Sequence, residues 1–178
     1  MEEIAQLRVV DCAASAFTVH KGKTPAARRS VPIHPELAEL VKRRSDGKAD
    51  TAFLFEELGE GAPKARGGGY ASPAKRGTGK AAAVMPRSAA VSKRFGRFIR
   101  RIDVAEVVKG KRRSLVNFHS FRRWFTTKAE QAGQPVHVIE AVMGHKRQGM
   151  TLGRYSGGPS EEQRRAVVEA VRLPAGAV

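Results

Sequence analysis

Four side chains in the last third of the sequence combine types and spacings that could do chemistry on an anion. His119 and Arg122 stand three residues apart at the head of an apolar-periodic run, and that spacing places both on one face of a helix. His145 follows Gly144 at the close of a second such run, and Tyr155 comes ten residues later, after a polar, glycine-containing turn. A guanidinium, two imidazoles and a phenol could therefore converge on one anion.

The motifs that carry these residues occur in a fixed order. The segments HSFR, GH and RY follow one another, with a Gly-Gln-Pro break between the first two. Nearer the N-terminus stand EEIAQLRVVD and KGKTPAARRSVPIHPEL. Each motif alone is a weak signal, but the ordered set resembles the catalytic domain of the tyrosine recombinases, the phage integrase family. The resemblance covers roughly residues 1–58 and 90–172.

The resemblance implies a role for each of the four side chains. Tyr155 would attack a DNA phosphate and form a 3′-phosphotyrosyl link, and a covalent intermediate of this kind retains the energy of the broken bond. Arg122, which keeps its charge, and His145 would bind oxygens of that phosphate. His119 would orient or deprotonate the nucleophile.

The general acid implied by the resemblance is Lys23, with Lys21 as the alternative. Both stand in the basic loop that follows residue 20. The chemistry requires no cofactor. No Cys and His cluster and no carboxylate pair in the sequence has the spacing of metal ligands, so we expect neither a cofactor nor a metal.

The start of the chain departs from the family pattern. The family has Arg-x-x-Glu here, in which the arginine is half of a phosphate clamp. Glu3 matches the glutamate, and the arginine would fall one place before Met1. We therefore expect residues 1–178 alone to be a partial catalytic domain, without the upstream helical DNA clamp, and a poor or inactive recombinase.

The composition indicates a polyanionic partner. The chain carries 33 Lys and Arg against 17 Asp and Glu, a formal net charge of +16, and such a surface attracts nucleic acid first and an anionic membrane second. No apolar run approaches the ~20 residues that span a bilayer, and no secretory signal is visible. The lone Cys12 suits a reducing cytosol, so we expect a cytoplasmic, DNA-associated protein bound to double-stranded DNA.

The positive charge is concentrated in the middle of the chain. Residues 61–118 hold 15 Lys and Arg against 2 acidic residues, which is +13 of the +16. Residues 59–90 are rich in Gly, Ala, Pro, Lys and Arg, and we expect a flexible basic insertion there. Residues 91–102 have apolar residues at helical spacing and cations opposite. Five basic residues, from the loop after residue 20 and from this helix, are expected to contact DNA: Lys21, Arg28, Lys93, Arg94 and Arg97.

Elsewhere the pattern predicts helices around one small sheet. Residues 16–20 and 29–33 have strand character and flank a loop, which predicts a hairpin. Helices are expected at 2–10, 35–45, 120–132 and 161–172, with a further helix after Pro135 that ends at Gly144. Two hypotheses stay open for the 161–172 helix: self-association by docking on a neighbouring protomer, as the resemblance implies, or packing on its own domain.

These observations predict one α+β domain, mostly α-helical, with a small antiparallel sheet near the N-terminus, as in the tyrosine-recombinase catalytic domain. The function that the resemblance implies is site-specific cutting and rejoining of DNA in integration or excision. Two alternatives remain. One is a type IB topoisomerase-like enzyme, which relaxes supercoils without exchanging partners. The other is a non-catalytic DNA-binding remnant that has kept the basic surface.

Overall fold

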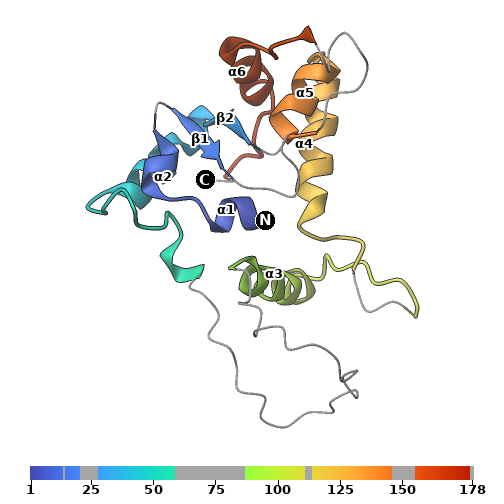
Figure 1. The fold of residues 1–178 in the computed structure, drawn as a ribbon. Coiled ribbons are helices and arrows are strands. Elements are labelled where there is room, and N and C mark those ends of the chain that lie inside the picture. Colours follow the sequence, from blue (N-terminus) through green and yellow to red (C-terminus); the bar gives the residue numbers. More distant parts are fainter. Residues whose placement is uncertain (14, 21–27, 59–86, 111–113, 146–154, 177–178) are drawn as a thin grey trace, which may run out of the picture.

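The structure is a computed structural model, and it describes residues 1–13, 15–20, 28–58, 87–110, 114–145 and 155–176. Figure 1 shows how its elements are arranged, and they are, in chain order: α1 (Glu2–Ala5), β1 (Ala16–Val19), β2 (Arg29–Pro32), α2 (Ala38–Ser45), α3 (Ser88–Arg101), α4 (His119–Gln131), α5 (Val136–Met143) and α6 (Glu161–Glu169), with 3₁₀ turns at Val9–Cys12, Pro35–Leu37 and Glu56–Leu58. This content confirms the predicted mixture of helices and a small antiparallel sheet. Within the described ranges, no helix is both long and apolar enough to cross a bilayer.

The strands β1 and β2 form the predicted hairpin sheet. They pair antiparallel, from Ala16 opposite Pro32 to Val19 opposite Arg29. Side chains alternate between the two faces of a strand, so Arg29 and Val31 share one face. Val31 packs against the helical core, and the same face therefore directs Arg29 toward the helices.

The core lies where α4, α5 and α6 meet β2. Val31, Trp124 and Phe125 pack against a cluster of buried side chains from these helices and the turn after α6: Ala129, Val138, Ile139, Val142, Met143, Val167, Val168 and Val171. In this arrangement α6 packs on α5 and β2 of its own chain (Figure 1), as the second hypothesis for this segment has it. Docking of α6 on a neighbouring protomer stays a prediction.

A buried arginine fixes the start of α3 against the N-terminal part of the chain. Arg87 Nε donates to the Ala5 carbonyl at 2.9 Å and Nη2 to the Phe55 carbonyl at 3.0 Å, and the guanidinium lies 3.6 Å from the centroid of the Phe53 ring. Arg87 falls within residues 59–90, where the composition predicted a basic insertion, but the structure buries its side chain. Residues 59–86 of that insertion lie outside the described ranges.

The helix predicted for residues 2–10 was wrong beyond its first turn. Arg8 pairs with Phe53 in an isolated antiparallel bridge, and the Leu54 amide donates to the Leu7 carbonyl at 2.9 Å. Backbone groups that are used in this pairing cannot also form the next helical turn. Contacts made by a distant segment therefore override the local helical pattern.

Several large apolar side chains in or beside the helices are exposed. The exposed fractions lie between 46% and 61% for Ile4, Phe98, Ile102, Phe121 and Val136. Val136 is the first residue of α5, where a side chain leans back over the preceding turn rather than into the core. Periodicity marks the apolar face of a helix but does not say what covers it.

Candidate active site

The C-terminal end of α5 closes in the way that its sequence predicts. Gly144 adopts the left-handed conformation with φ of 74°, and its amide donates to the Ala141 carbonyl at 3.2 Å. The His145 amide donates to the Glu140 carbonyl at 2.9 Å. These two bonds leave the last two carbonyls of the helix, at Val142 and Met143, in need of donors from elsewhere.

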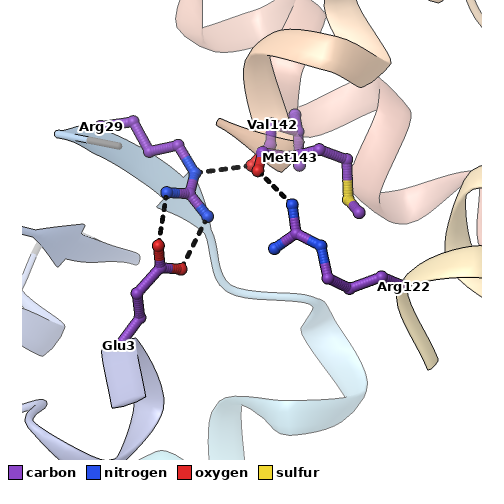
Figure 2. A network of polar contacts seen from close by, with 5 residues as sticks. All are labelled: Glu3, Arg29, Arg122, Val142 and Met143. Atoms are coloured by element: carbon purple, nitrogen blue, oxygen red, sulfur yellow. Dashed lines mark hydrogen bonds and ion pairs between the residues drawn. The ribbon is translucent and has the colours of Figure 1, made fainter. Parts of the chain in front are cut away.

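Two arginines from distant parts of the chain supply those donors. Arg29 Nε, from β2, donates to the Val142 carbonyl at 2.8 Å, and Arg122 Nη2, from α4, donates to the Met143 carbonyl. Figure 2 shows the two guanidiniums approaching the end of α5 from two sides. The carbonyl end of a helix carries partial negative charge, and it is a favourable place for cations.

A glutamate from α1 completes this network. Glu3 Oε2 accepts from Arg29 Nη2 at 3.1 Å, and Oε1 accepts from Nη1 at 3.4 Å (Figure 2). The exposed fraction of the Arg29 side chain is 12% and that of Glu3 is 28%. The contact thus joins α1, β2, α4 and α5 around two cations and one carboxylate.

Arg122 lies in an environment that makes its positive charge costly. Burial lowers the pKa of its guanidinium, the nearby charge of Arg29 lowers it further, and Glu3 opposes that shift. An arginine keeps its proton even so. Glu3 already balances the charge of Arg29, and a further negatively charged group beside Arg122 would balance the second positive charge.

A cleft of about 650 Å³ opens beside the network. Its lining is apolar apart from six side chains: Glu3, Arg29, His34, Arg44, His119 and Arg122. Apolar walls strengthen the field of the charges set in them, because little water screens them. Met1 lines the same cleft.

His119 and Arg122 are brought together as the sequence predicted. His119 is the first residue of α4, and both side chains line the cleft. The Asn117 side chain accepts from the His119 amide at 2.9 Å, and the Ser120 hydroxyl accepts from the Asn117 amide at 3.1 Å. These local bonds fix the start of α4 and hence the direction in which His119 leaves it.

His145 and Tyr155 stand at the two ends of residues 146–154, which the structure does not describe. His145 is exposed, and the exposed fraction of Tyr155 is 76%. Nothing in the described part of the chain shows a hydrogen bond between the Tyr155 phenol and Arg122. The structure thus brings the end of α5 to Arg122, and the approach of the phenol stays a prediction.

The other predicted residues are distributed between α3 and the loop after β1. Lys21 and Lys23 lie outside the described residues. Arg28 is exposed directly before β2, and three cations are exposed on α3: Lys93, Arg94 and Arg97. In the parts of the chain that are described, no three His, Cys, Asp or Glu residues form a group that could hold a metal ion.

Sequence analysis missed the part that Arg29 plays. A signal was nevertheless present, since in the strand RSVP the two-residue alternation puts Arg29 on the face of Val31. A charged residue on the inner face of a strand needs a buried partner, and Glu3 and the Val142 carbonyl are those partners.

A comparison with protein families identifies the family of this chain. The model described as the phage integrase family matches residues 1–158, which include every predicted catalytic residue. A search of curated proteins and a search of solved structures each found no match. The chain belongs to the phage integrase family, the tyrosine recombinases, and this membership implies DNA binding and site-specific DNA recombination.

Proposed function

We propose that the protein cuts and rejoins duplex DNA at specific sites through a covalent link to Tyr155, in integration or excision. The observation that carries the proposal is the half-buried Arg122 at the end of α5, beside the Gly144-His145 turn and a second guanidinium. Glu3 pairs with Arg29 there, which leaves Arg122 as the cation that an anion could bind, and a DNA phosphate is the anion that the family acts on.

The proposed reaction exchanges one phosphoester for another. The Tyr155 oxygen forms a bond to phosphorus, and the bond from phosphorus to the 5′ oxygen of the next nucleotide breaks. The phenol loses its proton, with His119 as the acceptor or orienting group, and the leaving oxygen gains one from Lys23. Attack of a DNA 5′-hydroxyl on the phosphotyrosine then reverses these steps and frees Tyr155.

Arg122 and His145 stabilise the charge that develops on the non-bridging oxygens. One fixed donor of this kind contributes about 2.7–4 kcal/mol to the transition state. The guanidinium of Arg122 makes one hydrogen bond in the described part of the chain, to the Met143 carbonyl. A guanidinium has five N–H groups, so it can keep this bond and still bind a phosphate.

In the proposed reaction the Tyr155 phenol has to reach the phosphate that Arg122 and His145 bind. Ten residues separate these positions, and a chain of that length spans at most about 33–36 Å. With 76% of its side chain exposed, the tyrosine leaves few contacts when it moves. Binding of DNA in the cleft region would supply the new contacts that hold it.

The exposed cations of α3 and Arg28 form the proposed electrostatic footprint on DNA. Each phosphate that they neutralise releases counterions, so log K should fall by about 0.9 for each such contact per tenfold rise in salt. A duplex affinity that does not change with salt would remove these residues from the interface.

A polypeptide of residues 1–178 alone should react slowly, since the resemblance puts a second clamp arginine one place before Met1. Loss of one donor worth about 2.7–4 kcal/mol lowers a rate about a hundredfold to a thousandfold. Met1 lines the cleft that holds Arg122, which supports the placement of that arginine. The reaction is therefore best tested in the chain extended by one arginine ahead of Met1.

The test uses a nicked suicide duplex, which loses its 5′ fragment after cleavage and so traps the covalent adduct. The extended chain should form an adduct that survives denaturation, and Tyr155→Phe should abolish it. The matched control is Tyr70→Phe, since the chain has two tyrosines. An adduct that persists in Tyr155→Phe would contradict the proposal, and relaxation of a plasmid without joining of two short duplexes would favour the topoisomerase-like alternative.

A further inference from the structure

We propose that Arg29 is a positioning residue: it holds the C-terminal end of α5, and through it the Gly144-His145 turn and the carbonyl that orients Arg122. The consequence for catalysis rests on the proposed function. The contact itself does not, because it is made within the chain.

The guanidinium of Arg29 packs directly on the turn that ends α5. A Cβ atom added at Gly144 would lie 2.7 Å from Arg29 Nη1 and 2.8 Å from its Cζ. Real Cβ atoms do not approach other atoms this closely, so a side chain at Gly144 would displace the guanidinium, and it would also strain a backbone with φ of 74°. His145 therefore follows directly after a residue whose backbone packs against Arg29.

Two further contacts fix the direction of the Arg29 side chain. Its Nε donates to the Val142 carbonyl at 2.8 Å, and its Nη2 donates to Glu3 at 3.1 Å. With 12% of the side chain exposed, the charge is largely removed from water, and these partners are what make its burial tolerable. A planar fork presents its donors on separate edges in a fixed geometry that reaches both partners, whereas an ammonium group is a compact point charge.

Arg29 and Arg122 bind successive carbonyls of the same helix end, at Val142 and Met143. A shift of the last turn of α5 therefore moves the anchor of both guanidiniums together. If the Arg29 contacts are lost, the last turn frays, and Arg122 loses a fixed acceptor. The prediction is a local loosening of the α5 end rather than a general loss of structure.

Amide hydrogen exchange, followed by NMR on the whole chain without DNA, tests this directly. Arg29→Gln should speed exchange at Gly144 and His145 about tenfold to a hundredfold, as expected when a charge-assisted hydrogen bond that closes a local opening is lost. Amides of α6 should keep their rates. The matched control is Arg44→Gln, which breaks another Arg–Glu pair, with Glu57 at 2.7 Å, and should leave the α5 end unchanged.

Two further variants keep the test decisive. Glu3→Gln leaves Arg29 in place with a weaker partner, so it should speed hydrogen exchange at the same amides by a smaller factor. This variant replaces Arg29→Gln in the test if Arg29→Gln does not fold. Arg29→Lys should restore the exchange rates only in part. In the arginine-extended chain, Arg29→Gln should slow adduct formation at saturating protein, where a change in duplex affinity no longer limits the rate.

The outcomes separate this inference from the proposed function. Unchanged exchange at Gly144 and His145 in both Arg29→Gln and Glu3→Gln would overturn the positioning role, and so would equal acceleration in α6, which would mean a general structural role. Faster exchange confined to the α5 end supports the positioning role even if no variant forms an adduct. That last result would count against the recombinase chemistry alone.

Discussion

The ends of α4 and α5 are built alike. Each closes with a glycine in the left-handed conformation, Gly133 with φ of 72° and Gly144 with φ of 74°. At each end the glycine amide donates to the carbonyl three residues back, and the next amide donates to the carbonyl five residues back. Sequence alone predicts both ends by the same rule, a glycine after an apolar-periodic run.

The two ends differ in what surrounds them. A Cβ atom at Gly133 would meet nothing within 4 Å, whereas one at Gly144 would meet the guanidinium of Arg29. The first end is a turn in solvent, and the second is where β2, α1 and α4 deliver charged side chains. A helix terminus thus becomes a site through its tertiary partners and not through its own backbone.

The largest effect on the rate should come from substitution of Arg122, which stands beside Arg123 on α4. Arg122 donates to the end of α5, while its neighbour Arg123 donates to the Leu115 carbonyl and the Ser120 hydroxyl. Arg122→Gln should lower the rate of adduct formation about a hundredfold to a thousandfold, since one transition-state donor is worth about 2.7–4 kcal/mol. The rate is measured with the suicide duplex and the arginine-extended chain.

Arg123→Gln is the matched control, and it should leave the rate close to that of the unsubstituted protein. Equal losses in the two variants would mean that the end of α5 has no special part in the chemistry. The contrast between the two helix ends would then be structural only.

The next effect in size is on stability. Gly133→Ala should lower the free energy of unfolding by about 1–2 kcal/mol, the cost of a left-handed conformation for a residue with a Cβ. Gly144→Ala should lower it by about 1–3 kcal/mol more, because the new methyl group overlaps the guanidinium. Urea denaturation of both variants measures the difference. Equal values would show that Arg29 does not lie against Gly144 in solution.

A double-mutant cycle isolates this contact. In an Arg29→Ala background the space beside Gly144 is open, so the effect of Gly144→Ala should fall to that of Gly133→Ala. The expected coupling is about 1–3 kcal/mol, within the range for residues in direct contact. Additive effects of the two substitutions would contradict the packing seen here.

The smallest effect should distinguish the two Arg–Glu pairs of the N-terminal half. Glu3→Gln weakens a partly buried pair that supports the α5 end, and a hydrogen bond to a charged group contributes about 1.5–3 kcal/mol. The Arg44–Glu57 pair is more exposed, and solvent screens its charges. Glu57→Gln should therefore change the free energy of unfolding by about 0–1 kcal/mol. Urea denaturation compares them. If Glu57→Gln proves the more costly, the support assigned to Glu3 is wrong.

Local patterns predicted much of this fold. Alternation predicted the hairpin of β1 and β2, and a glycine after an apolar-periodic run predicted the end of α5. The HSFR and GH motifs predicted Arg122 at a helix start and His145 just past a helix end, and both lie there. These features depend on neighbours in the sequence, which is why they could be predicted.

The features that sequence analysis missed depend on distant segments. Arg29 acquires its role only when α1 and α5 come together around β2, and Arg87 is buried only because Ala5, Phe53 and Phe55 surround it. A count of charges treats both as surface cations. Their contacts with carbonyls more than thirty residues away cannot be derived from the residues beside them.

Mass spectrometry of the peptide that remains bound to DNA tests the central claim most directly. The arginine-extended chain is incubated with the nicked suicide duplex, the adduct is digested, and the residue that carries the nucleotide is identified. The account predicts a phosphoester on Tyr155, with the DNA attached through its 3′ end. Attachment to any other residue, or the absence of a covalent species under conditions in which the duplex is bound, would contradict it.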